Sequence, residues 1–357
     1  MRPDEILASY QQAFDNPSGS DWLEQYKNSI QKFVKENNLD NFWKKQLLST
    51  IRKSKKIPKQ DLLVYSKLLV ETEEEVRNSI LTDSDIILPP VAVGSVFSND
   101  LNVKTIPCLN GGVIIVFDIN LLEFILLTLN IVYDRYFIEL HDNNGVLLGS
   151  KSHNIKHDYE FLEILMKCLV KQKPFDILKI LPSPKIAKLV DMTFHSILIF
   201  LMAHEYGHIV NNEVVKSKIN NRTNNWIKEY YSDSYGLKKV LELLSKKYGS
   251  TIPLLGVQFL FSLFHIVNKA CPDLASETDT HPPPEMRREN IKDYIRIAMP
   301  NRNFNDLFSI FDNLNSTILS LWEVNSSAFN DNVRDLIMSE NIEIDKNSKI
   351  YKRLFDT

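Results

Sequence analysis

The sequence predicts a mainly α-helical protein with a small β-sheet, an α+β fold, and two patterns carry this prediction. Apolar residues recur at helical spacing along most of the 357 residues, which is typical of amphipathic helices. One segment, from about residue 83 to 118, is instead rich in proline, glycine and β-branched residues, and it predicts short strands joined by turns. We expect three parts: a helical lobe over 1–82, a main domain over 83–300 and a helical extension over 301–357.

The N-terminal lobe is expected to consist of polar amphipathic helices. Apolar residues repeat at helical spacing in "DWLEQYKNSIQKFVKEN" and again in "KQDLLVYSKLLVETEEEVRNSIL". The basic run between them, "RKSKKIPK", has no interleaved aromatic residues and is typical of a solvated turn. The chain has 42 basic and 45 acidic side chains, so its net charge does not attract nucleic acid. We therefore expect no nucleic-acid partner.

Two apolar stretches that follow predict the small sheet. "IILPPVAVGSVF" and "VKTIPCLNGGVIIVFD" have the composition of short strands, with turns at Pro89–Pro90 and at Asn110–Gly112. The run "GGVIIVFD" leaves two alternatives open. It is either a sheet edge with which an extended peptide could pair, or an internal strand, because its apolar residues do not alternate.

Helices are expected to resume at about Ile119 and to continue, with a break at residues 141–145, through the C-terminal part. A proline-rich turn begins "LPSPKIAKLVDMTFHSILIFLMAHEYGHIVNNE", and Pro184 then stands near the start of a long apolar helix. Further helices are predicted at about 224–247, 252–269 and 282–298, followed by two more.

Apolar runs at residues 111–134 and 194–210 approach the length of a membrane span, but both contain polar or charged side chains. Charges are costly in lipid, so no transmembrane segment is expected. The N-terminus lacks the apolar core of a secretory signal. The cysteines are three, scattered and without a CxxC pair, which suits a reducing compartment. These observations favour a cytoplasmic location.

The stretch "LMAHEYGHIVNN" carries the local pattern with the most defined chemistry, H-E-x-x-H. On an α-helix, His204 and His208 project from one face a single turn apart, so both imidazoles can bind one tetrahedral Zn²⁺. Glu205 lies about 100° away around the helix, which suits a general base acting on a metal-bound water. The alternative, a buried helix whose histidines have ordinary hydrogen-bond partners, is disfavoured because the pattern is rare by chance. His153 and His157 have the same four-residue spacing, but they lie by a turn without an evident third ligand, so metal binding there is disfavoured. His195 and His265 are expected to be structural.

A catalytic zinc needs a third protein ligand, and the next predicted helix supplies a candidate. In "WIKEYYSDSYGLKKV", Glu229 and Asp233 are four residues apart on one face. Glu229 can then reach the metal, while Asp233 orients a ligand histidine through its free ring nitrogen. Glu213 is the competing ligand, although it follows the histidine helix directly and would have to fold back.

HEYGH, followed by "EYYSD" and then "THPPPEMR", resembles the ordered motif set of the gluzincin metallopeptidases. The resemblance is to the type that includes the CAAX-prenyl endopeptidases and the membrane heat-shock peptidases, which show H-E-x-x-H, then E-x-x-A-D, then H-P followed by Arg. It covers residues 193–290 only. Ser232 replaces the usual Ala, and the flanking membrane helices of those proteins are not predicted here. A soluble, intracellular relative is the closest description, and the phage-exclusion (Lit-like) peptidases are another H-E-x-x-H group of this kind.

The resemblance implies a zincin-like catalytic domain and a role for each matched residue. The zinc ligands would be His204, His208 and Glu229, the catalytic base Glu205, a second catalytic residue His281, and the supporting residues Asp233 and Arg287. A held imidazole of His281 could donate a hydrogen bond to the oxyanion that develops on the scissile carbonyl. The alternative is that His281 only packs beside the proline turn, and Tyr230 and Tyr231 are rival donors.

The predicted function is therefore a zinc-dependent endopeptidase that hydrolyses an intracellular protein or peptide. Two alternatives stay open. One is a zinc-containing regulatory or interaction protein, in which the metal helix is scaffold and the N-terminal lobe binds a partner. The other is a latent protease that a partner or a phage component activates. The glutamate between the histidines favours an enzyme, because a structural zinc site needs no base.

Overall fold

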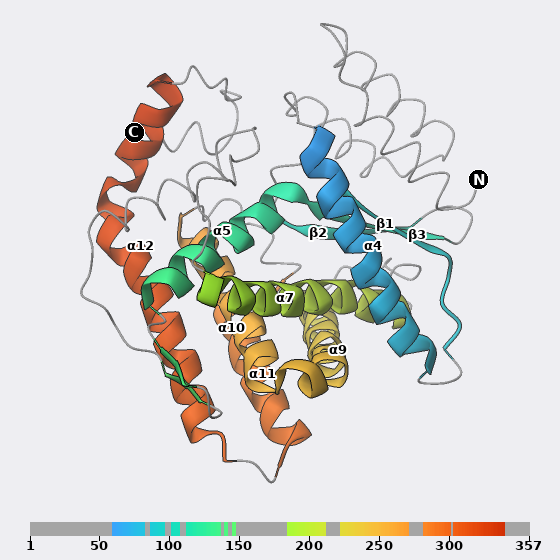
Figure 1. Ribbon diagram of the computed structural model, residues 1–357. Coiled ribbons are helices and arrows are strands. Elements are labelled where there is room, and N and C mark those ends of the chain that lie inside the picture. The colour runs from blue at the N-terminus through green and yellow to red at the C-terminus, as the bar shows by residue number, and fades with distance from the viewer. Residues whose placement is uncertain are drawn as a thin grey trace, which may run out of the picture. The chain divides into compact units, whose positions relative to one another are not determined.

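The computed structural model describes residues 59–82, 86–96, 101–107, 112–136, 139–141, 145–147, 184–211, 222–270, 281–300 and 303–339 (Figure 1). Within these ranges the chain is mostly helical with a small three-stranded sheet, which confirms the predicted fold class. The described chain also contains a two-stranded pairing of β4 (Glu139–His141) with β5 (Gly145–Leu147). The predictions for the first 58 residues, for His153 and His157 and for Glu213 lie outside the described residues.

The chain divides into two compact units, which are described in turn. The first combines residues 1–123 with 172–175 and 201–219, and the second combines 124–171, 176–200 and 220–357. The boundary falls inside α7 (Pro184–Val210), so this one helix contributes residues to both units. Nothing tests the predicted three-part division, which stays a prediction.

In the first unit, the strands form a sheet in the order β1-β3-β2. The strands are β1 (Val91–Val96), β2 (Val103–Pro107) and β3 (Val113–Asp118). Strand β3 runs parallel to β1 and antiparallel to β2, and it is buried at every position. A central strand uses both of its hydrogen-bonding edges, so it cannot pair with a peptide. The edge-strand hypothesis for "GGVIIVFD" is therefore wrong, and the internal-strand alternative is confirmed.

Asp118, the last residue of β3, holds together the turns around it. Its Oδ1 accepts a hydrogen bond from the backbone N–H of Asn120 (3.0 Å), which caps the start of α5 (Ile119–Tyr136). Its Oδ2 accepts a second bond from the backbone N–H of Leu101 (3.0 Å). Leu101 has a φ of +46°, in the left-handed region that non-glycine residues rarely adopt. The Asp118 carboxylate therefore fixes the chain just before it enters β2.

Helix α4 (Lys59–Thr82) packs on strand β1 in the same unit (Figure 1). Leu69, Val76 and Ile80 are fully buried and recur at the helical spacing expected from the sequence. The guanidinium of Arg77 donates from Nη2 to the carbonyl oxygen of Val91 (3.1 Å). This bond joins the helix to the backbone of the sheet.

In the second unit, α10 (Thr251–Ala270) packs against helices that come before and after it in the chain (Figure 1). These are α9 (Arg222–Tyr248), α11 (Pro284–Ala298) and α12 (Asn305–Ser339). The predicted helices begin and end within two residues of the bounds of α9, α10 and α11, and α12 is one of the two helices predicted after them. The remainder of the C-terminal tail, 340–357, lies outside the described residues. Helices α7 and α10 are long and apolar enough to cross a membrane, but most of each is buried inside the protein, as core helices are.

Two glycines let helices of the second unit approach α7 closely. A Cβ added at Gly256 would lie 3.0 Å from the carbonyl oxygen of Thr193 and 3.1 Å from Cβ of Ser196. A Cβ at Gly236 would lie 3.0 Å from the carbonyl oxygen of Phe200. A Cβ at either position would fit only if α7 moved by a few tenths of an ångström, so glycine suits the observed close packing.

We expect Gly256→Ala to lower the free energy of unfolding by about 1–3 kcal/mol, because overpacking against α7 outweighs the gain in helix propensity of about 1 kcal/mol. Urea denaturation followed by circular dichroism measures the change. Lys67→Ala, at a side chain that is 80% exposed, is the control and should change stability by less than about 0.5 kcal/mol. A Gly256→Ala protein as stable as the wild type would show that the two helices separate at no cost.

Candidate metal centre

The last two turns of α7 bring two imidazoles together. His204 and His208 are four residues apart on the helix, and their Nε2 atoms lie 3.2 Å from each other with the rings nearly perpendicular. Two nitrogens bound to one tetrahedral zinc, each at about 2.0–2.1 Å, would stand roughly 3.3 Å apart. The spacing of the two nitrogens therefore fits a shared ion with little rearrangement.

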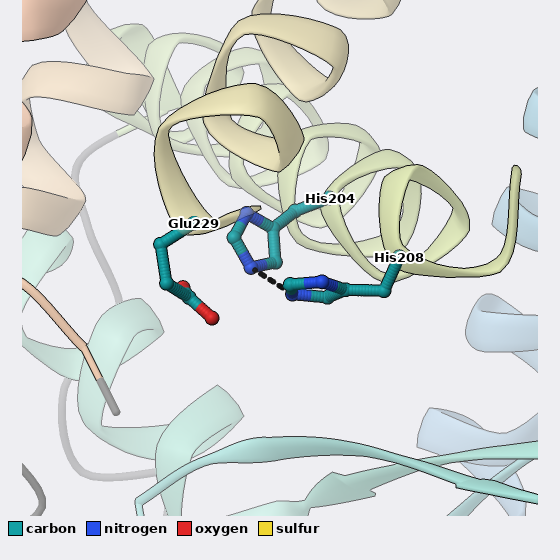
Figure 2. A group of neighbouring side chains, drawn as sticks. All are labelled: His204, His208 and Glu229. Carbon is teal, nitrogen blue, oxygen red and sulfur yellow. Dashed lines mark hydrogen bonds between the residues drawn. The ribbon is translucent and has the colours of Figure 1, made fainter. Parts of the chain in front are cut away.

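The carboxylate of Glu229, on α9, completes a group of three ligand atoms. One ligand atom of each of His204, His208 and Glu229 lies within 4.8 Å of the others, and Figure 2 shows the carboxylate turned toward the two imidazoles. His204 and Glu229 are buried and His208 is half-buried. This group could hold a metal ion. Two histidines and one glutamate form a donor set found in catalytic zinc sites, where a fourth position stays open.

The side chains of Arg287 and His281 lie on either side of the Glu229 carboxylate. Arg287 Nη2 lies 3.5 Å from Glu229 Oε2, and His281 Nε2 lies 3.4 Å from Glu229 Oε1. These distances are long for hydrogen bonds, so the arginine acts on the carboxylate mainly through its charge. The His281 side chain is 40% exposed, whereas that of Glu229 is 7% exposed. His281 therefore faces both the carboxylate and the solvent.

Asp233 binds Arg287 through two hydrogen bonds. Arg287 Nε donates to Asp233 Oδ2 (2.8 Å), and Nη2 donates to Oδ1 (2.6 Å). Asp233 is fully buried, and the guanidinium also lies 5.0 Å from the ring centre of Phe261. Because Asp233 stands one turn after Glu229 on α9, it holds the arginine beside the carboxylate. The predicted contact of Asp233 with a ligand histidine stays a prediction, whereas its contact with Arg287 was not foreseen.

The proline turn before α11 places His281 and Arg287. Pro283 precedes the helix with extended backbone angles, and Pro284 occupies its first turn, where a missing N–H is tolerated. Of the rival oxyanion donors, Tyr231 is 42% exposed and stacks on Tyr235. Burial raises the pKa of Tyr230, and Asp233 raises it further. Neither observation assigns an oxyanion donor.

Glu205, the predicted base, is held from the sheet. The hydroxyl of Thr105 on strand β2 donates to Glu205 Oε2 at 2.5 Å, and Glu205 is 7% exposed. The bond joins the strand directly to the helix that carries the histidine pair. Thr105 was not predicted from the sequence, because no local motif links a strand residue to a helix residue 100 positions later.

Tyr206, the next residue, is held from helix α4. Its hydroxyl donates to Glu73 Oε1, and the same oxygen pairs with Arg77 Nε at 2.8 Å. Burial raises the pKa of Tyr206 well above its ordinary value, and the charge of Glu73 raises it further, so the hydroxyl keeps its proton. Arg77 in turn binds the backbone of β1. The helical turn that carries Glu205 and Tyr206 is thus connected to both α4 and the sheet.

We expect Tyr206→Phe to lower the free energy of unfolding by about 1–3 kcal/mol, because a buried carboxylate loses a hydrogen-bond donor. Denaturation with guanidinium measures the loss. The matched control is Tyr231→Phe, at an exposed tyrosine, which should cost less than about 0.5 kcal/mol. Equal losses in the two variants would contradict a specific role for the Tyr206 hydroxyl.

Metal binding by the three-residue group is testable without a substrate. We expect Glu229→Ala to weaken zinc binding by about 100-fold or more, since it removes one ligand, and His204→Ala or His208→Ala to do the same. Competition with a chromogenic chelator gives the affinity, and plasma mass spectrometry gives the bound metal. Glu71→Ala, at a side chain that is 61% exposed on α4, should bind zinc like the wild type. Normal affinity in Glu229→Ala would remove that residue from the ligand set.

Comparisons of this chain with protein families, with curated proteins and with solved structures found no match. The resemblance to the gluzincins therefore rests on the order of three sequence motifs, and it stays an expectation. The geometry stands independently of that resemblance. A buried His204, His208 and Glu229 group could hold a metal ion, next to a glutamate that a threonine hydroxyl holds in place.

Proposed function

We propose that this protein is a zinc-dependent endopeptidase of the gluzincin type. The observation that carries the proposal is the convergence of two imidazoles and one carboxylate, with Glu205 adjacent to His204 in the same helical turn. Three protein donors leave one coordination position of a zinc ion for water. A structural site would use all four positions and would have no need of a neighbouring base.

Each residue then has a defined task. His204, His208 and Glu229 would hold Zn²⁺, and the ion would supply an acidified water and polarise a carbonyl. Glu205 takes a proton from the attacking water and transfers it to the nitrogen of the leaving amine. This use of one carboxylate as base and then as acid converts a peptide bond into a carboxylate and an amine.

The residues around Glu229 support this chemistry in two ways. Arg287, held by Asp233, lies beside the Glu229 carboxylate and would help to orient it as a ligand. His281 is partly exposed beside that ligand, and its imidazole N–H is suited to donate to the oxyanion of the tetrahedral intermediate. Arg287 is occupied by Asp233 through two bonds and is therefore assigned to positioning rather than to the oxyanion.

The substrate in this proposal is an intracellular protein or peptide, and the enzyme is cytoplasmic. Latency until a partner or a phage component acts is compatible with the same site, because it changes access and not the ligands. A zinc-containing interaction protein is the alternative from another class. It would bind zinc at the same residues but would show no cleavage that depends on Glu205.

Replacing Glu205 by Gln should abolish cleavage, with at least about a 1,000-fold loss, while zinc binding persists, since the amide keeps the shape but cannot take a proton. The measurement compares new protein N-termini by mass spectrometry in cells that express wild type or the variant, with zinc content determined for both. Glu71→Gln, at a side chain that is 61% exposed on α4, is the matched control and should cleave like the wild type.

Cleavage products that appear with wild type and with the control, but not with Glu205→Gln, would establish proteolysis and identify the substrate. Products that persist in Glu205→Gln would overturn the assigned base. The absence of any wild-type product, with zinc bound, would reject constitutive peptidase activity in those cells.

A further inference from the structure

We propose that Thr105 is a positioning residue for the general base, an inference that rests on the peptidase function proposed above. Its hydroxyl holds one oxygen of the Glu205 carboxylate, so that the other oxygen is the one that accepts the proton of the attacking water. Strand β2 thereby contributes a residue to the reaction centre. The sequence motifs do not include this residue.

A glutamate carboxylate needs a fixed partner if one particular oxygen is to face the attacking water. Its terminal torsion has a broad, nearly two-fold energy profile, so an unrestrained carboxylate samples many orientations. The bond from Thr105 Oγ1 to Glu205 Oε2, at 2.5 Å, selects one of them. Because Glu205 is 7% exposed, little water competes for this bond, and a bond to a charged group is strong in such surroundings.

Thr105, the hydrogen-bond donor, is itself held in a fixed position by the sheet. Thr105 lies in the middle of β2, opposite Ile115 of the central strand β3. Threonine is branched at Cβ, which restricts its first side-chain torsion. The chain enters β2 through Leu101, whose backbone N–H is bound by the carboxylate of Asp118. The sheet therefore fixes the position of the Thr105 hydroxyl, and the branched side chain leaves it little freedom to rotate.

The two carboxylate oxygens of Glu205 have different partners in this proposal. Among the described residues, the bond to Thr105 engages Oε2, which leaves Oε1 for the water. In the reaction, an O–H bond of the water breaks, the proton goes to Oε1, and the electron pair forms the bond to the carbonyl carbon. The proton then passes to the leaving nitrogen as the C–N bond breaks. The Thr105 proton stays on Oγ1 throughout, so the base is held in both of its protonation states.

The experiment separates positioning from packing by means of two substitutions at the same site. Thr105→Val keeps the branched shape and removes the hydroxyl, whereas Thr105→Ser keeps the hydroxyl and removes the methyl group. The control is Thr128→Val, the same change at a buried threonine of α5. The probe is a synthetic peptide that spans the cleavage site found by comparing wild type with Glu205→Gln.

We expect Thr105→Val to lower kcat about 10- to 100-fold, a loss typical of a misplaced catalytic group, with KM and zinc content unchanged. Thr105→Ser should retain at least about half of the wild-type kcat, because it preserves the hydrogen bond. Thr128→Val should match the wild type. The pattern of a kcat loss in Val and recovery in Ser is not produced by a defect in packing, which would affect Ser as well.

The inference fails alone if wild type cleaves the peptide in a manner that requires Glu205 and Thr105→Val cleaves it equally well. It also fails if Thr105→Val and Thr105→Ser lose activity together with zinc, since that outcome indicates a structural role. If no cleavage depends on Glu205, no cleavage site exists to define the peptide, and the inference falls together with the proposed function. The zinc and kinetic measurements keep these outcomes distinct.

Discussion

The candidate site depends on how the buried carboxylate of Glu229 is compensated. An ionised carboxylate removed from water is costly unless opposite charge or hydrogen bonds replace its hydration. Arg287 supplies the opposite charge at 3.5 Å, and its own burial is offset by the two bonds that it donates to Asp233. The net charge of the two carboxylates and one guanidinium is −1. That residual negative charge is what a divalent cation between Glu229 and two neutral imidazoles would neutralise further.

The four-residue spacings in the two motifs have different physical uses. In HEYGH the spacing puts two like groups, His204 and His208, on one face so that they meet at a common point. On α9 the same spacing puts a carboxylate near that point and, one turn later, a second carboxylate that anchors an arginine. The same four-residue spacing therefore brings two ligands together on α7, whereas on α9 it places one ligand and the residue that holds its neighbouring arginine.

Much of this site could be predicted from the sequence, because its main information is local. The histidine pair and the pair of Glu229 with Asp233 each lie within about one helical turn, and the long helix α7 follows from its apolar spacing. Thr105 and Glu73 could not be found in this way, because each meets its partner only after the chain has folded back. Glu73 was further hidden by its neighbours: it stands in "TEEEV", which has the composition of a solvated helix face, yet it is 7% exposed. The central position of β3 was left open for a related reason, since strand order is set by pairing and not by composition.

The hydrogen bond between Tyr206 and Glu73 changes where a minimal fragment of this protein must begin. By composition, the change from helical lobe to main domain falls near residue 83, which invites truncation there. Such a fragment would lack α4 and would leave the Tyr206 hydroxyl facing a site from which its acceptor and the guanidinium of Arg77 had been removed. The shortest fragment able to keep the metal-binding turn intact therefore includes α4, even though none of its residues belongs to the three motifs.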